Sequence, residues 1–426
     1  MKDYFDIKFH KTTYRAEIMA GITMFLSTVY ILVVNPTVLQ QCGMDYYSVF
    51  LATVFTSAIS TFVMSVYAKM PILLAPGLSM NVMFVVVTMR YFHGDYKMAL
   101  LGTYLSGVLF FALVITGIFR EIDNRIPDCV KSGVLAGLGL ALMRTGLNSV
   151  QFFEKTISKE VLLTIIGIVV MWILRRHHVS GFIIYGMLIT AIVGCVGMAI
   201  LSPDNFVKEI SDMIAYEAFE WKGEQFFREC FHFPSVTTIM RNPEKLLNLL
   251  TVTAIFTIYH FADAVGTTSS IYIFMKETGT ELPASYREKS MYVNGIAGMV
   301  SGLFGTSSAT SYAESTVGVA EGAKTGVASL TASILFLLFG FVIRFVNGIP
   351  TFITAPTLIV SGVISCMILK HLKEWKWVER VIAVAMTLYI GFTFQIANGV
   401  IAGMLVYMGY LMGIRKFAAK KAGDVK

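Results

Sequence analysis

Charged residues are scarce in this sequence of 426 amino acids. Asp, Glu, Lys and Arg together make up 14% of it, whereas a soluble protein carries about a quarter. Hydrophobic residues make up 56%, and the mean hydropathy is +0.69. Apolar runs of about 18 residues or more, each long enough to cross a bilayer as a helix, recur from end to end. They do not alternate as the strands of a membrane β-barrel would. The composition therefore excludes an ordinary soluble domain and predicts an all-α polytopic membrane protein.

Several chemical signatures are also missing. The five cysteines are scattered at positions 42, 129, 195, 230 and 366, without the spacing of a disulfide framework or a metal site. A Walker loop is absent, which argues against ATP-driven transport on this chain. The N-terminus is charged and lacks the short apolar core of a removable signal peptide. No metal and no cofactor are therefore expected, and no nucleophile–base pair indicates an enzyme.

The apolar runs can be placed as fourteen spans, with boundaries good to a few residues. The spans are 16–34, 48–68, 71–89, 98–118, 127–143, 160–175, 181–201, 245–262, 287–304, 305–322, 324–343, 350–369, 376–392 and 394–414. If the N-terminus lies in the cytoplasm, most of the 34 basic residues fall in cytoplasmic segments, as the positive-inside rule requires. An even number of spans with both termini inside follows. Orientation also explains the net charge of +7 better than nucleic-acid binding does.

One long polar loop, 202–244, separates the spans into two halves of seven. An odd number of spans on each side of such a loop is what an inverted repeat requires. Apolar residues at helical spacing within the loop also allow an amphipathic helix lying on the membrane surface. The predicted architecture is therefore two inverted seven-span repeats.

The third span of each half is interrupted. Span 3, "KMPILLAPGLSMNVMFVVV", contains Pro71 and Pro76, which cannot donate a backbone hydrogen bond. Span 10, "GTSSATSYAESTVGVAEG", carries seven Ser or Thr and three Gly. We expect it to be extended over 305–310 and to start a short helix near Tyr312, whose free N–H groups would favour electron-rich atoms. Close helix packing through small residues is the alternative. Matched interruptions in two halves point instead to a transport site.

Two acids lie in apolar surroundings, Asp263 and Glu314. A charge at the bilayer centre costs roughly 2.5–3.5 kcal/mol on insertion scales, so such acids face a cavity or a partner. A carboxyl group withdrawn from water exchanges a proton readily, which suits proton coupling. The alternative is a structural acid bonded to helix ends. Glu321 beside Lys324 indicates an ion pair at the membrane interface. His260 is interpreted as a histidine at a helix end that finds its hydrogen-bond partner locally.

Aromatic residues lie close to both acids in the sequence, namely Tyr259, Phe261 and Tyr312. They could serve ordinary bundle packing. They could also stack on a flat ligand, a contact worth about 0.5–1.5 kcal/mol beyond area burial. Acids, backbone N–H groups and aromatic rings at one depth in the membrane are suited to bind a planar heterocycle whose edge alternates hydrogen-bond donors and acceptors.

These segments resemble a known family. "AGITMFLSTVYILVVNP", "LLAPGLSMNVMF", "DAVGT", "GLFGTSSATSYAESTVGVAEGAKTG" and "IPTFITAPTLIVSG" are similar to motifs of the nucleobase–ascorbate (xanthine/uracil permease) superfamily, in its adenine/guanine/hypoxanthine branch. The resemblance implies fourteen spans, with short antiparallel strands in spans 3 and 10. It also implies a core domain at 16–122 and 245–343 and a gate domain at 123–201 and 344–414. The segments 1–15 and 415–426 would be cytoplasmic.

The resemblance also implies site residues and partners. Asp263 and Glu314 would bind the base or carry the coupled proton. The other positions matched to the substrate site are Thr267, Tyr312, Ala313, Ala75, Asn81, Ser27 and Tyr30. Phe261 joins the expected substrate-binding residues as an aromatic ring next to Asp263 that could stack on the base. The branch usually has Gly where this chain has Ser79 and Ala where it has Val82, so a shifted base preference is open.

The expected activity is import of a purine base across the cell membrane, with H⁺ rather than Na⁺ as the coupling ion and with a homodimer formed through gate surfaces. Uracil or xanthine specificity stays open. An anion carrier or exchanger with the same fold is the rival, although two carboxyl groups would repel anions. A channel would need a charged ring or a repeated filter, and neither is present.

Overall fold

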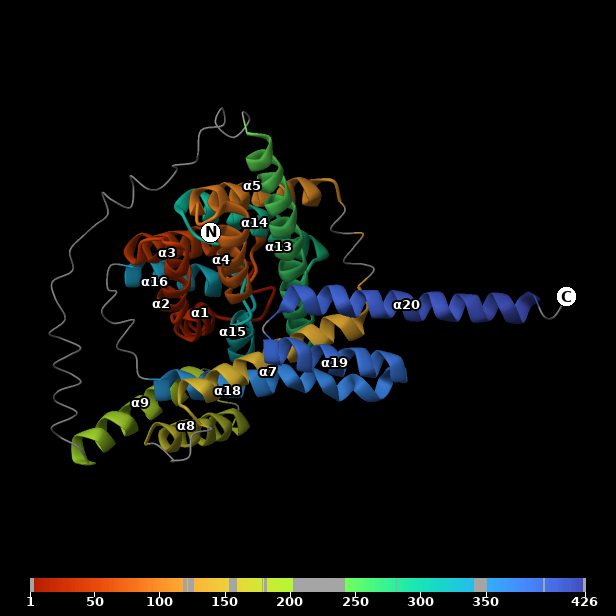
Figure 1. The fold of residues 1–426 in the computed structure, drawn as a ribbon. Coiled ribbons are helices and arrows are strands. Elements are labelled where there is room, and N and C mark those ends of the chain that lie inside the picture. The colour runs from red at the N-terminus through yellow and green to blue at the C-terminus, as the bar shows by residue number, and fades with distance from the viewer. Residues whose placement is uncertain are drawn as a thin grey trace.

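The computed structural model describes residues 4–117, 121, 126–152, 159–177, 179, 182–201, 242–280, 282–340, 351–393 and 395–423. The described chain is mostly helical, and its helices form two groups (Figure 1). The first group contains α1 (Tyr14–Thr28), α2 (Ile31–Leu39), α3 (Tyr46–Val63), α4 (Leu78–Phe92), α5 (Tyr96–Ile115), α13 (Pro243–Glu277), α14 (Ala284–Phe304), α15 (Ser315–Glu321) and α16 (Gly326–Gly340). The second contains α7 (Asp128–Ser149), α8 (Lys159–Arg176), α9 (Phe182–Leu201), α18 (Thr351–Cys366), α19 (Trp377–Thr393) and α20 (Ile396–Gly423).

Several helices are long and apolar enough to cross a membrane. They are Tyr14–Cys42, Tyr46–Ala68, Tyr96–Ile115, Pro243–Glu277 and Phe352–Glu374, with shorter apolar helices at Met80–Phe92, Tyr185–Val196, Gly326–Gly340 and Asn398–Met412. These observations support the predicted all-α membrane class. The first segment is longer than the expected span 16–34, and its helix breaks at Val29 and Tyr30 before α2 begins.

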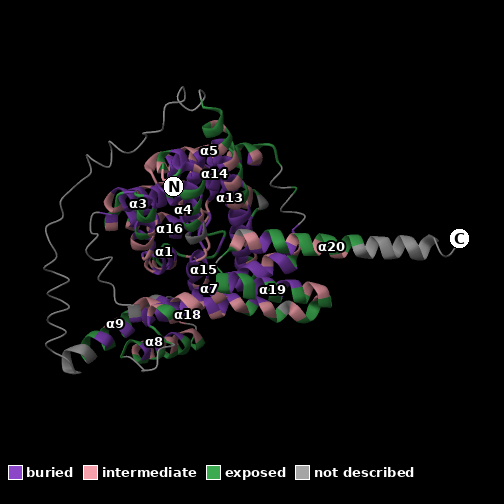
Figure 2. Cartoon of the chain, viewed as in Figure 1, coloured by how far each residue is buried: buried purple, intermediate pink, exposed green. Residues whose placement is uncertain are grey.

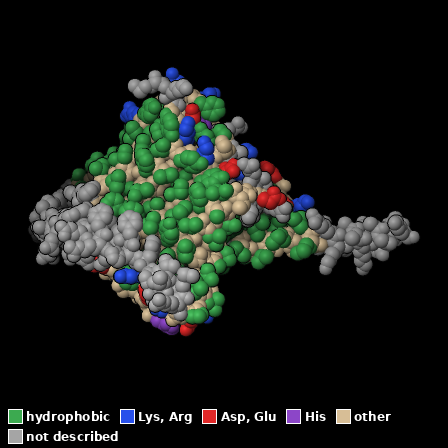
Figure 3. Space-filling view, turned by 90° about the horizontal axis from the view of Figure 1, so that it is seen from above, with side chains coloured by type: hydrophobic (Ala, Val, Ile, Leu, Met, Phe, Trp, Pro, Cys, Tyr) green, Lys and Arg blue, Asp and Glu red, His purple; other side chains and the backbone are tan. Residues whose placement is uncertain are grey.

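Buried residues concentrate in the first group and along α7, while α8, α19 and α20 expose much of their surface (Figure 2). The exposed side chains are largely apolar, as at Trp172, Ile192, Phe392 and Leu405. Seen from above, hydrophobic side chains cover most of the described surface, with only small groups of charged side chains between them (Figure 3). Such a surface is suited to lipid rather than to water.

Two short strands pair with each other inside the first group. β1 (Leu74–Pro76) and β2 (Ala309–Ser311) pair antiparallel, with Leu74 opposite Ser311. Irregular backbone of this kind is tolerated at membrane depth only where protein buries it, and all six strand residues are buried. The helix after β2 begins at Ser315, three residues beyond the predicted start near Tyr312. The reason is that the strand pairing continues for one residue beyond β2, since the Tyr312 N–H donates to the carbonyl of Leu73, the residue before β1, over 2.8 Å.

The eighth predicted span, 245–262, is much too short. α13 continues from Pro243 to Glu277, so His260 and Asp263 lie in mid-helix and not at a helix end. The sequence after Asp263, "AVGTTSSIYIF", lacks proline, and the Ser270 hydroxyl bonds back to the Gly266 carbonyl at 2.7 Å. A small polar residue whose hydroxyl group hydrogen-bonds to a carbonyl of its own helix does not end that helix.

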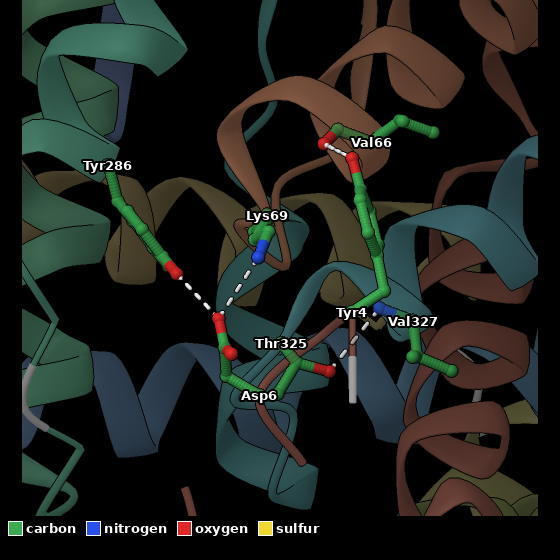
Figure 4. A network of polar contacts seen from close by, with 7 residues as sticks. All are labelled: Tyr4, Asp6, Val66, Lys69, Tyr286, Thr325 and Val327. Atoms are coloured by element: carbon green, nitrogen blue, oxygen red, sulfur yellow. Dashed lines mark hydrogen bonds and ion pairs between the residues drawn. The ribbon is translucent and has the colours of Figure 1, made fainter. Parts of the chain in front are cut away.

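The segment before α1 ties two helices of the first group together (Figure 4). Asp6 accepts hydrogen bonds from the Lys69 ammonium at 3.1 Å and from the Tyr286 hydroxyl at 2.8 Å. Tyr4 donates to the Val66 carbonyl at 2.8 Å, and Lys69 lies over its ring. The predicted amphipathic helix in the 202–244 loop falls on residues outside the described part of the chain.

Glu321 has a different partner from the one expected. Its Oε2 accepts the backbone N–H of Ile183 at 3.0 Å, so the carboxylate of α15 contacts the first turn of α9 in the second group. Lys324 gives its backbone N–H to Glu17 at 2.9 Å. The predicted Glu321–Lys324 interfacial pair is therefore replaced by a contact between the two groups.

Candidate substrate site

A cavity of about 50 Å³ lies where the two groups meet. Because one water occupies roughly 10–15 Å³ on the same measure, the space holds a few waters. Its walls come from the first group at Tyr30, Gly77, Asp263 and Thr310–Glu314, and from the second group at Leu138, Ala141, Leu142 and Ile396. α15 follows this wall and lies at the junction of the groups (Figure 1). One wall is therefore polar and the other apolar.

Asp263 projects from the middle of α13 onto β2. Its side chain is 2% exposed, and its Oδ2 accepts a hydrogen bond from the Thr310 hydroxyl at 3.2 Å. Oδ1 has no hydrogen-bond partner within the described residues. A buried carboxyl oxygen without a partner is costly, so this atom is available to a donor that enters the cavity.

Glu314 lies just before the first residue of α15. It is 4% exposed and accepts a hydrogen bond from the Tyr30 hydroxyl at 2.7 Å. The same hydroxyl lies 3.3 Å from the Tyr312 hydroxyl. The break between α1 and α2 places Tyr30 at this point, since Tyr30 is the residue before α2 begins. The three side chains form a linked polar group at one end of the cavity.

The structure brings some of the predicted site residues together and leaves others outside. Tyr30, Asp263, Tyr312, Ala313 and Glu314 line the cavity, while Thr267, Ala75, Asn81, Ser27 and Phe261 are not among its lining residues. Thr267 and Ala75 are fully buried, on α13 and β1 respectively.

The remaining three residues make contacts outside the cavity. Asn81 accepts a hydrogen bond from the Ser307 hydroxyl, and Ser27 donates to the Thr23 carbonyl of its own helix at 2.8 Å. Phe261 packs against Phe110, with ring centroids 5.3 Å apart. Asn81 and Phe261 therefore join neighbouring segments of the chain, while the Ser27 hydroxyl is satisfied within α1.

Sequence reasoning missed the apolar wall. Leu138, Ala141, Leu142 and Ile396 are ordinary apolar residues in apolar helices, and no sequence signal distinguishes them from lipid-facing neighbours. Thr310 and Ser311 lie inside the interrupted span and could have been selected with it. Gly77 follows β1 and leaves space beside Asp263, whose Oδ2 would lie 3.6 Å from an added Cβ.

The arrangement can recognise a small planar ligand. The lining offers two carboxyl groups, hydroxyl groups and two tyrosine rings on one side, and aliphatic side chains on the other. Carboxyl oxygens accept hydrogen bonds from ring N–H groups, and a protonated carboxyl can donate one. No lining residue is Lys or Arg. No group of three or more His, Cys, Asp or Glu that could hold a metal ion occurs in the described residues.

Known proteins with similar sequences are permeases over nearly the whole chain. A permease of Methanocaldococcus jannaschii is 31% identical, covering 96% of this chain and 91% of its own. The guanine/hypoxanthine permease PbuG of Bacillus subtilis is 30% identical over 96% of this chain and 93% of its own. The adenine permease AdeQ of Escherichia coli is 26% identical over 95% and 88%.

A solved structure shares the fold without close sequence similarity. The murine Solute Carrier 26 family member A9 anion transporter in the inward-facing state matches 97% of this chain and 69% of its own with a TM-score of 0.50 and 11% identity. The family model for xanthine/uracil permeases, described as "Permease family", matches residues 15–400. With a match of that length and a polar cavity between apolar helices, the chain belongs to this permease family and is an integral membrane protein.

Proposed function

We propose that this protein is a secondary active transporter that imports a purine base with H⁺. The observation that carries the proposal is the pair of buried carboxyl groups, Asp263 and Glu314, on the wall of one cavity. Relatives named for a purine include guanine/hypoxanthine and adenine permeases, which supports a purine. The ring N–H groups of a purine would donate to the carboxyl oxygens, and its face would rest on the aliphatic wall.

The proposed transport cycle is based on a cavity that has one wall from each helix group. In this proposal the fourteen spans form two inverted repeats, and the first helix group is the core domain and the second the gate domain. Movement of the core against the gate would open the cavity to each side of the cell membrane in turn. Both termini would be cytoplasmic, and a homodimer would form through the gate surfaces. Protonation of Glu314 or Asp263 would be linked to binding because a carboxyl group deep in protein is more stable when neutral or hydrogen-bonded.

An anion carrier with the same fold has less support. The cavity wall holds two carboxyl groups and no basic side chain, so an entering anion would meet repulsion instead of attraction. Likeness in fold to an anion transporter does not transfer its substrate, because one fold supports many sites.

Uptake of radiolabelled bases tests the proposal. Adenine, guanine, hypoxanthine, xanthine and uracil would be offered to cells that lack their own base carriers, with bicarbonate and chloride as anion arms. We expect saturable purine uptake that a protonophore collapses and that Glu314→Gln or Asp263→Asn abolishes. Glu244→Gln, an exposed carboxylate on the first turn of α13, is the matched control and should retain uptake.

Two results would overturn the proposal in different parts. If the protein is present in the membrane and takes up none of the bases, the assignment of a nucleobase as the substrate is wrong. If both carboxyl variants take up purine at the full rate, the assignment of Asp263 and Glu314 to the substrate site is wrong.

A further inference from the structure

The outer edge of β2 is held by side chains of α14 and not by a third strand. An unpaired strand edge buried in protein must find other partners for its N–H groups. The Ala309 N–H donates to the Ser301 hydroxyl at 2.8 Å, and the Ser311 N–H donates to the Asn294 Oδ1 at 2.8 Å. On β1 the Leu74 N–H donates to the Thr61 hydroxyl of α3 at 3.0 Å. Two helices therefore complete the hydrogen bonding of a two-stranded sheet.

Asn294 makes more of these contacts than Ser301 does. Its Nδ2 donates to the Ser311 hydroxyl at 2.9 Å and to the Ser290 carbonyl of its own helix at 2.8 Å, and the Ser311 hydroxyl reaches Oδ1 at 3.2 Å. The Ser311 hydroxyl also bonds to Thr268 of α13 at 2.8 Å. The amide thus fixes both the backbone and the side chain of Ser311, which lines the cavity.

Asn294 is fully buried and does not line the cavity. It is joined to the cavity wall through Ser311, whose neighbour Thr310 donates to Asp263. The position of β2 sets where Thr310, Ser311 and the carboxyl of Asp263 stand relative to one another. A shift of this strand would move all of them against a bound ligand.

From this geometry we propose that Asn294 is a positioning residue for substrate binding, acting by locking β2 at Ser311. The inference rests on the proposed function for the identity of the ligand. Its mechanical part, the immobilisation of β2 by one amide, is independent of which ligand binds. Ser301 supplies the comparison, because it bonds to Ala309, which is not a lining residue.

Uptake kinetics distinguish positioning from a purely structural role. Asn294→Ala removes three hydrogen bonds to Ser311, so we expect a KM for the purine that rises about tenfold or more. Vmax per molecule of membrane protein should stay within about threefold of the unsubstituted protein. Ser301→Ala should lower thermal stability but leave KM within about twofold. In a Ser311→Ala background, Asn294→Ala should raise KM by less, because the two residues act through one contact.

Hydrogen–deuterium exchange of the purified full chain supplies a readout that needs no substrate. Peptides covering 309–312 should exchange faster in Asn294→Ala than in the unsubstituted protein. Unchanged exchange there, or an unchanged KM beside reduced abundance, would overturn the inference. An equal increase in KM on Asn294→Ala with and without Ser311→Ala would also overturn the inference. Failure of the unsubstituted protein to take up any purine would overturn the proposed function instead, and the exchange experiment would still decide whether Asn294 holds β2.

Discussion

Tyr30 and Glu314 are far apart in the sequence but share a short hydrogen bond at 2.7 Å. The sequence predicts Glu314 as a site residue because a carboxyl group inside an apolar span is conspicuous. Tyr30 is a tyrosine among many aromatic residues, and only its resemblance to a family position selected it. The pairing itself depends on the break after α1, which turns the Tyr30 side chain toward span 10.

Replacing Tyr30 by Phe removes this hydrogen bond together with the longer contact between the Tyr30 and Tyr312 hydroxyls. Bonds to charged groups contribute about 1.5–3 kcal/mol, so the KM for the transported base should rise between roughly tenfold and a hundredfold. Tyr312→Phe is the control, because it removes the contact between the two hydroxyls, at the longer distance of 3.3 Å, and leaves the bond from Tyr30 to Glu314 in place. Uptake kinetics measure both variants. An effect of Tyr312→Phe as large as that of Tyr30→Phe would contradict the expectation.

Asp6 should make stability depend on pH. Burial alone would raise the pKa of this carboxyl, but hydrogen bonds from Tyr286 and Lys69 and the charge of Lys69 outweigh it and hold the pKa below its usual value of 3.8. A carboxyl whose pKa is lower in the folded state stabilises the protein above its unfolded pKa and loses that contribution as pH falls through the folded pKa.

Asp6→Asn tests this dependence. Thermal unfolding in detergent should show the unsubstituted protein more stable than the variant by a constant margin between about pH 5 and pH 7, well above the unfolded pKa. The margin should shrink below about pH 4 as Asp6 becomes protonated. A margin that stays constant down to about pH 3 would show that the ion pair contributes nothing.

At the scale of elements, prolines and glycines made the interruptions predictable. Pro76 and the Gly- and Ser-rich span 10 cannot form regular helix throughout, and the structure places β1 and β2 there. The end of α13 was predicted wrongly because a stretch rich in Gly, Thr and Ser looks like a loop. In the protein interior the Ser270 hydroxyl bonds to the Gly266 carbonyl of the same helix and the Thr268 hydroxyl bonds to Ser311 of β2, and the helix continues.

The packing of α7 against α18 depends on two facing glycines. A Cβ added at Gly139 would lie 2.6 Å from the Gly362 carbonyl oxygen, so Gly139→Ala must push the helices apart at a cost of about 1–3 kcal/mol. Gly409→Ala is the control, because nothing lies within 4 Å of its added Cβ. We expect a lower midpoint of thermal unfolding for Gly139→Ala and an unchanged or higher one for Gly409→Ala. The reverse order would contradict this packing.

For the whole molecule, the contact between Glu321 and the Ile183 N–H joins the two helix groups at 3.0 Å. If the groups move against each other during transport, this contact must break and reform. Loss of a hydrogen bond to a carboxylate, about 1.5–3 kcal/mol, is large enough to change the populations of two conformations severalfold or more.

Labelling of a cysteine in the cavity reports such a change. In a background where the native cysteines are replaced, Ala141→Cys on α7 lines the cavity and would be reacted with a membrane-permeant thiol reagent. Glu321→Ala should change the labelling rate severalfold, because it removes the acceptor. Glu321→Gln keeps an acceptor oxygen but not the charge, so its labelling rate should lie between those of the parent and Glu321→Ala. Identical rates in all three proteins would show that the contact does not hold the groups together.

The sequence by itself determined the membrane class, the interruptions in spans 3 and 10 and the two buried acids that line the cavity. These follow from local physics, since burial of charge, missing backbone donors and apolar length are properties of a single segment. Only the tertiary structure decided that Tyr30 meets Glu314, that Thr310 meets Asp263, that α14 completes the edge of β2 and that aliphatic residues of α7 and α20 close the cavity. Each of these joins segments distant in the chain, and an apolar residue facing a ligand carries the same local signal as one facing lipid.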